Sequence, residues 1–235
     1  MVRKLLQLLE MEQETESESG GFPLAAATVL HKMLDCRRYS TQVCLLFPEF
    51  FVALIFQLKR SGELASEEDR AMYVNEWAPF EPPPATRTLV EAALRLLWWM
   101  ELEDLKSTMT RLEMWRWLLC GDEWQSAVPD ISEMMLSSCR DQCARIFSHL
   151  QKLLLHPELR WREVPALTFY TELWSCEELR DEDTCAEEIF RKYICSEKPR
   201  SRELALRGLR GLYAHVGVGS WPHVPPCPHR APRRP

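Results

Sequence analysis

Glycine is scarce in this sequence, and no apolar run is long enough to span a membrane. Only 8 of the 235 residues are glycine, and alternating runs of β-branched residues are missing, so helices are predicted nearly everywhere. The most apolar stretch, residues 44–58 (CLLFPEFFVALIFQL), is interrupted by Pro48 and Glu49 and falls short of the ~20 apolar residues that a spanning helix needs. We therefore expect a helical chain without a membrane span.

Recognisable catalytic and cofactor motifs are also missing. No Ser/His/Asp or Cys/His arrangement, glycine-rich phosphate loop or pair of catalytic carboxylates stands out. We therefore predict that the protein is not an enzyme and needs no cofactor.

The nine cysteines are an odd number scattered mostly within helical patterns, and the first 30 residues show no cleavable secretory signal. This usage predicts reduced thiols and an intracellular location, cytoplasmic or nuclear, rather than secretion. Cys139 and Cys143 are one helical turn apart, a spacing that suits a metal. Both fall on an apolar stripe, however, so we interpret them as core thiols. A second cluster, in the tail, would bind a metal only adventitiously: His215, His223, Cys227 and His229.

Charge is distributed unevenly along the chain. The net charge is −6, yet no acidic residue follows Glu203, and the five arginines after it make the C-terminal end basic. The rest of the chain is therefore acidic and lacks the electrostatic footprint of a nucleic-acid-binding protein. We expect protein partners and no nucleic acid.

Composition divides the chain into three parts. Residues 1–21 hold a short helical pattern followed by an acidic, serine-rich linker, residues 22–213 hold the helical patterns, and residues 214–235 form a tail rich in proline and arginine that we predict to be disordered. The run PFEPPPAT at residues 79–86 is predicted to be a stiff connector between helices.

Hydrophobic residues recur with helical spacing through the middle part. The helix over residues 44–58 is apolar on more than one side and is expected to be the core helix, ended by Gly62 and paired as an antiparallel hairpin with the helix before it. Helix pairs begin at intervals of 38 to 56 residues, close to the repeat lengths of paired-helix solenoids. The predicted helices cover residues 23–36, 44–58, 66–77, 89–100, 104–120, 131–155 with a break near Ser137, 160–174, 183–195 and 199–213.

Five segments in the same order resemble the maestro heat-like repeat family, most of all the C-terminal part of its long members. They are FPEFFVALIFQL at 47–58, EAALRLL at 91–97, MWRWLLCGDEWQSAV at 114–128, RWREVPALTFYTELW at 160–174 and RELALRGLRGL at 202–212. The resemblance implies an all-α fold, an α-solenoid of HEAT/armadillo-like paired helices, with a protein-binding or scaffolding role and no catalytic residues. Because the long members carry many more repeats upstream, it also implies an isoform or a fragment.

Exposed tryptophans and the proline-rich tail are the predicted contact sites. Trp117 lies opposite the apolar stripe of its helix, and Trp98 and Trp99 lie off the stripe of theirs, so these three are candidate partner contacts. The tail segment PPCPHR matches the PxxPxR ligands of SH3 domains through Pro225, Pro228 and Arg230. Two functions stay open: an interaction scaffold that binds through its helical surface, and a regulatory or targeting module whose tail does the binding.

Both ends of the helical array are predicted to carry uncovered apolar surface. An apolar pattern begins abruptly, without a cap, at Leu5, Leu6, Leu8 and Leu9, and the helix bearing Leu209 and Leu212 has no following partner. Such surface favours self-association, because large exposed apolar patches are uncommon in soluble monomers.

Overall fold

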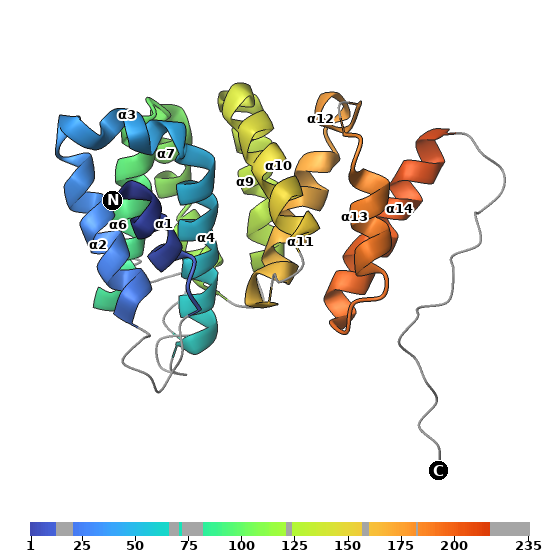
Figure 1. Ribbon diagram of the computed structural model, residues 1–235, viewed down its shortest axis with the longest axis horizontal. Helices are drawn as coiled ribbons and strands as arrows, with labels where there is room; N and C mark the ends of the chain where they lie inside the picture. The colour runs from blue at the N-terminus through green and yellow to red at the C-terminus, as the bar shows by residue number, and fades with distance from the viewer. Residues whose placement is uncertain are drawn as a thin grey trace, which may run out of the picture. The chain divides into compact units, whose positions relative to one another are not determined.

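The computed structural model describes residues 1–12, 21–65, 71, 82–120, 124–156, 160–181 and 183–216 (Figure 1). Within these ranges the secondary structure is helical and no β-strand occurs, which confirms the all-α class. None of the described helices is long and apolar enough to cross a membrane. The acidic linker from residue 13, the predicted helix over residues 66–77 apart from residue 71, the connector up to residue 81 and the tail from residue 217 lie outside the described residues.

The chain folds as two compact units, Met1–Lys152 and Leu153–Pro235, so the predicted repeat domain, residues 22–213, extends over both. The helices of the first unit are α1 (Val2–Leu9), α2 (Phe22–Leu34), α3 (Arg37–Leu45), α4 (Phe47–Leu64), α6 (Pro84–Trp99), α7 (Glu103–Arg111), α8 (Met114–Leu119), α9 (Trp124–Ser138) and α10 (Arg140–Leu155), whose last turn enters the second unit.

Helix α4 is the core helix of the first unit, as its sequence predicts. It packs against α1, α6 and α8, and Val52 and Phe56 are buried together with the residues of its main apolar face. Pro48 lies in the first turn, where its missing N–H costs no intrahelical bond. Phe51 stacks on Phe47 at 5.5 Å between ring centroids, and Phe56 meets Trp124 edge-on at 6.4 Å.

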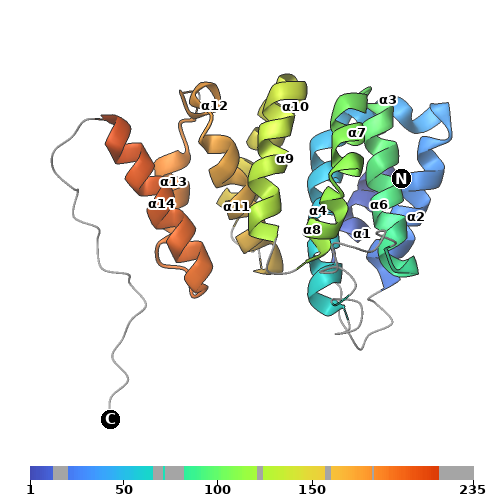
Figure 2. The same cartoon turned by 180° about the vertical axis from the view of Figure 1, so that it is seen from behind.

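The predicted hairpin of α2 with α4 is wrong. Helix α2 packs mainly on α6 and α1 (Figure 1, Figure 2), and α6 and α1 also contact α4. The periodicity of α2 shows an apolar face but cannot show which helix covers it, because several amphipathic helices offer equivalent faces.

Several local boundaries differ from the predicted ones. Helix α4 begins at Phe47 and continues past Gly62 to Leu64, and α9 begins at Trp124 rather than at residue 131. Helix α3 was not predicted, and α6 begins at Pro84, inside the expected connector. The single helix predicted over residues 104–120 is two helices, because Glu113 adopts a left-handed conformation (φ 49°) between α7 and α8. The buried Arg116 pairs with the Glu113 carboxylate at 3.0 Å, which helps to hold this turn. The break predicted near Ser137 is confirmed, at Cys139.

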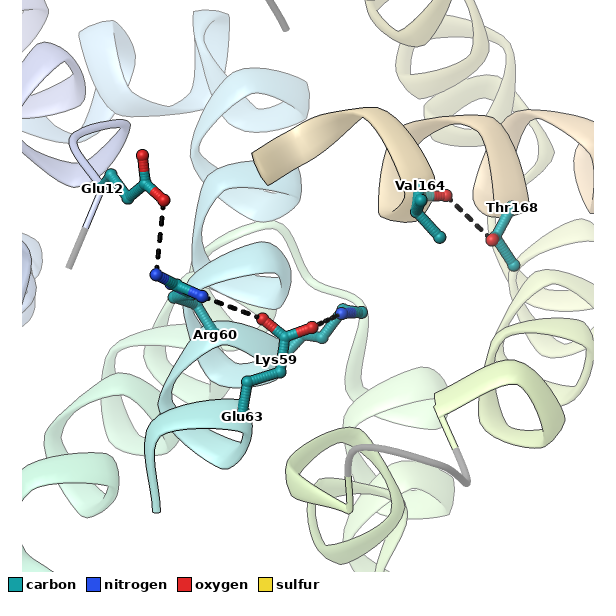
Figure 3. Close-up of polar contacts among 6 residues, drawn as sticks. All are labelled: Glu12, Lys59, Arg60, Glu63, Val164 and Thr168. Atoms are coloured by element: carbon teal, nitrogen blue, oxygen red, sulfur yellow. Dashed lines mark hydrogen bonds and ion pairs between the residues drawn. The ribbon is translucent and has the colours of Figure 1, made fainter. Parts of the chain in front are cut away.

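The second unit contains a short 3-10 turn at Arg160–Arg162, α11 (Glu163–Trp174), α12 (Glu177–Asp181), α13 (Ala186–Tyr193) and α14 (Pro199–Val216). Helix α14 packs against α13 and α11. As predicted, α11 is enclosed and α13 buries only a narrow stripe. The buried Thr168 hydroxyl donates to Val164 O at 2.9 Å (Figure 3). The buried Thr171 hydroxyl donates to Leu167 O at 2.6 Å, so both hydroxyls are satisfied within α11.

Helix α13 caps the last turn of α10. The Lys192 ammonium donates to Leu154 O at 2.6 Å and His156 O at 2.7 Å, and the Tyr193 hydroxyl donates to Leu154 O at 2.7 Å. Burial lowers the pKa of Lys192 and raises the pKa of Tyr193. These bonds satisfy carbonyl groups that a helix end otherwise leaves without partners.

The ends of the helical array are covered in part, which corrects the prediction for Leu5, Leu9 and Leu209, whereas Leu6, Leu8 and Leu212 are only half-buried. Leu5 and Leu9 are buried because α1 packs on α2 and α4, and Leu209 is buried in the second unit. Inside the first unit the buried Gln57 amide donates to Leu9 O at 2.5 Å and Met11 O at 2.7 Å. Arg60 continues this connection by pairing with Glu12 at 3.3 Å, as Figure 3 shows.

Replacing Gln57 with leucine should detach the end of α1 from α4. The leucine fills a similar volume but leaves two carbonyl groups without their donor, and we expect a loss of about 1–3 kcal/mol in the free energy of unfolding. Urea unfolding measures this loss. Gln125→Leu on the exposed face of α9 is the control and should change stability by less than ~0.5 kcal/mol. Equal stability of the two variants would show that the Gln57 bonds contribute nothing.

Candidate functional site: the Trp98 surface

Trp98 lies in the last turn of α6 and is the exposed tryptophan of this helix, with 48% of its surface accessible. The Arg95 guanidinium lies over the Trp98 ring, 5.1 Å from its centroid, and the neighbouring Trp99 ring meets Trp98 edge-on at 5.5 Å. The three side chains therefore form a small ordered surface, which we call the Trp98 surface.

Arg95 is held from a second side. Its guanidinium forms an ion pair with Asp35, which follows the last residue of α2. Because the pair is partly exposed, its own contribution to stability is small. Its consequence is positional: the guanidinium is fixed between the end of α2 and the face of Trp98.

The backbone after Trp98 turns away through a Schellman motif. The Leu102 N–H bonds to Leu97 O at 3.0 Å and the Glu101 N–H bonds to Trp98 O at 3.1 Å, and Glu101 is left-handed with φ 58°. The motif satisfies the carbonyl groups of Leu97 and Trp98 and ends the helix at Trp99. Trp98 therefore projects from a well-defined helix end.

Trp99 packs against the Trp98 ring and adds little exposed area to this surface. It is half-buried, and its Nε1–H is buried without an acceptor among the described residues. Trp115, Trp124 and Trp174 share this last property, so it does not single out Trp99 as a contact. The sequence pattern predicted Trp98 and Trp99 as equivalent contacts. In the structure Trp98 is exposed and Trp99 is half-buried beside it.

Trp117 is half-buried rather than exposed, and every other side chain of α8 is buried. Helix α8 packs on α4, α7 and α9, whereas the Trp98 surface is formed by α6 and is held to the end of α2. Trp117 is therefore a separate candidate contact. The tail candidates Pro225, Pro228 and Arg230 lie outside the described residues.

A second surface was missed by the sequence analysis. Leu45, at the end of α3, is 68% exposed and borders two hollows. One, of about 370 Å³, is lined by α1 and α3, and the other, of about 340 Å³, is lined by the start of α4 and by α10. Arg145 donates to Leu45 O at 2.8 Å and fixes this corner. Leu45 was assigned to the buried core helix, and only the unpredicted turn at Leu46 places it outside.

The cysteines behave mostly as the sequence predicts. Cys139 and Cys143 are buried, and the described residues contain no group of three or more His, Cys, Asp or Glu side chains that could hold a metal ion. Cys195 is the exception, because it is disulfide-bonded, which contradicts the expectation of reduced thiols throughout. No periodic signal in the sequence distinguishes Cys195 from the other cysteines.

Comparison of the chain with protein-family models, with curated proteins and with solved structures found no match. The resemblance to the maestro heat-like repeat family therefore stays a prediction. What the protein does has to be inferred from its described surfaces.

Proposed function

We propose that this protein is a non-enzymatic interaction scaffold built from HEAT-like helical repeats, and that it binds a protein partner through the Trp98 surface. The observation that carries the proposal is the half-exposed Trp98 ring held between Arg95 and Trp99. Tryptophan and arginine are the residue types most enriched where binding energy concentrates in protein interfaces.

The ordering of the ring supports a binding role. A side chain that is already fixed loses little conformational freedom when a partner covers it, so more of the burial energy appears as affinity. Arg95 over one face and the edge of Trp99 restrict the Trp98 ring before any partner arrives. An exposed leucine such as Leu206 has no aromatic ring on which an arginine or a second ring could stack, so it is not held in this way.

The scaffold part of the proposal draws on the helices themselves. Enclosed α11 is followed by one-sided α13, the alternation that stacked helical layers require. The first unit has a packed interior around the buried side chains of α4. The second unit has its own, where the glycines of α14 lie close to the rings of Phe190 and Trp174. A surface residue on such a scaffold can be changed with little effect on the fold.

Replacing Trp98 with alanine should weaken partner binding by at least tenfold, which corresponds to about 1.4 kcal/mol. The midpoint of thermal unfolding should change little, because the ring is half-exposed. Partners identified with the full chain are remeasured against the variant by calorimetry. Leu206→Ala, at a comparably exposed apolar residue of α14, is the control and should keep full affinity. Unchanged affinity of Trp98→Ala for every partner would reject the proposal.

The same measurement separates the alternatives. If the tail is the binding element, deletion of residues 217–235 abolishes binding and Trp98→Ala does not. If Trp117 is the contact, Trp117→Ala lowers affinity without the loss of stability that follows truncation of a core aromatic, about 3–5 kcal/mol. A second copy of the chain is a possible partner, and sedimentation of the wild type beside Trp98→Ala would show it.

A further inference from the structure

Cys139 is the single residue between α9 and α10. Its N–H bonds to Met135 O at 2.8 Å and closes α9, while its carbonyl accepts the N–H groups of Gln142 at 2.9 Å and Cys143 at 3.0 Å and begins α10. Cys139 therefore occupies the position that caps the N-terminus of α10. Cys143 follows at the end of the first turn.

The two thiols are in hydrogen-bond contact. The hydrogen bond from Cys143 lowers the pKa of Cys139, although burial acts in the opposite direction. A thiol at a helix N-terminus is also favoured as a thiolate by the helix dipole. Cys139 is thus the more reactive of the two sulfurs, and the Cys143 thiol is in contact with it.

The backbone geometry suits a covalent bond between these sulfurs. The bond from Cys143 N–H to Cys139 O is the i to i+4 bond of a helical turn, which places the two Cα atoms about 6 Å apart. Disulfides join Cα atoms that are about 4.4–6.8 Å apart. A disulfide also needs Cβ atoms about 3.5–4.5 Å apart, whereas Cβ atoms at i and i+4 of a regular helix are about 5–6 Å apart. Bond formation therefore needs rotation of the two side chains and a local shift of the backbone at Cys139, which lies between the two helices.

Access differs between the two thiols. Cys139 is 8% exposed, whereas Cys143 is fully buried behind it. A small oxidant can reach the rim of Cys139, and a bulky alkylating reagent reaches neither thiol easily. The pair should thus label slowly with a maleimide and still respond to a small oxidant.

We propose that Cys139 and Cys143 form a redox-sensitive dithiol that a peroxide converts to an intramolecular disulfide at the junction of α9 and α10. The Cys139 sulfur attacks one oxygen of hydrogen peroxide, the O–O bond breaks, and sulfenic acid and water form. The Cys143 sulfur then attacks the Cys139 sulfur, the S–O bond breaks, and the oxygen leaves as a second water with the thiol proton. The two thiols are oxidised and one peroxide is reduced to two waters.

The disulfide closes the first turn of α10 covalently and ties it to the end of α9. Because the bond forms from a sulfenic acid and a neighbouring thiol, the further oxidation of Cys139 to irreversible products is prevented. A dithiol reductant restores the two thiols. The oxidation state of the two thiols therefore determines whether the junction between α9 and α10 is covalently closed.

The test uses the full chain and hydrogen peroxide. After treatment, free thiols are blocked and the protein is digested with trypsin, which cleaves after Arg140 and separates the two cysteines into peptides 117–140 and 141–145. We expect these peptides to be joined by a disulfide and to separate on reduction. Cys120 shares peptide 117–140, so Cys120→Ser is the matched control and should leave the link unchanged.

Two further variants examine the order of the steps. Cys143→Ser should lose the link and accumulate a sulfenic acid at Cys139 that dimedone traps, whereas Cys139→Ser should give neither product. Circular dichroism confirms that each variant is folded. The proposal is overturned if the wild type shows no link while Cys139 proceeds to sulfinic acid, or if the link survives in Cys139→Ser.

Discussion

Replacing Gly62 with alanine should destabilise the first unit by about 3 kcal/mol, the upper part of the range for overpacked cores. Gly62 lies two residues before the end of α4, and a Cβ atom there would be 1.9 Å from Leu119 O and 2.6 Å from the Leu119 carbonyl carbon. The obstacle is backbone, so no side-chain rotation relieves it. Helices α4 and α8 would have to move apart, which opens the core that they share.

Helix propensity alone predicts the opposite sign. Alanine stabilises a helix interior by about 1 kcal/mol relative to glycine, and a position chosen only for propensity would gain stability. Urea unfolding of Gly62→Ala measures the balance, with Gly21→Ala as the control, because a Cβ at Gly21 meets no atom within 4 Å. Stability of Gly62→Ala within ~0.5 kcal/mol of the wild type would show that α4 and α8 are not in this close contact.

Replacing Gly208 with alanine should destabilise the second unit by about 2–3 kcal/mol. A Cβ at Gly208 would be 2.2 Å from two ring atoms of Phe190. The Phe190 ring is fully buried, with Tyr170 at 5.6 Å and Trp174 at 5.4 Å between ring centroids. It cannot swing aside without disturbing both neighbours, so α14 must shift away from α13.

Gly211, one turn further along α14, supplies a matched control. A Cβ there meets the Trp174 ring at 3.0 Å and 3.5 Å, a contact that a shift of a few tenths of an ångström relieves, and alanine gains helix propensity. We expect Gly211→Ala to stay within ~1 kcal/mol of the wild type. Urea unfolding with hydrogen exchange at the α13 amides follows the second unit. If both glycine variants unfold alike, the close approach of α14 to Phe190 is not a determinant of stability.

The Trp98 surface was predictable in part. The position of Trp98 and Trp99 off the apolar stripe of α6 is a property of helical spacing, and the sequence alone indicates it. Arg95, which stacks on Trp98, is three residues earlier on the same helix, and residues at this spacing are neighbours on a helix surface, so this contact was also predictable. The ion pair of Arg95 with Asp35 is a tertiary contact between α6 and the end of α2, and no local pattern reveals it.

The sequence by itself determined the helical class, the buried character of α4, the enclosed α11 and the break near Cys139. Each depends on spacing near 3.6 residues per turn and on local proline and glycine signals, which act within a few residues. Tertiary structure decided which helix covers which face: α2 packs on α6 rather than α4, α1 is covered, and Leu45 is left exposed. Only the tertiary structure shows that Gly62 is needed for the close approach of α4 to Leu119 O. In the sequence, a glycine that ends a helix cannot be told from a glycine that packs against a neighbouring backbone. The physical reason is that burial and close approach depend on residues distant along the chain. The spacing of apolar residues shows only that a helix face must be covered and does not show which helix covers it.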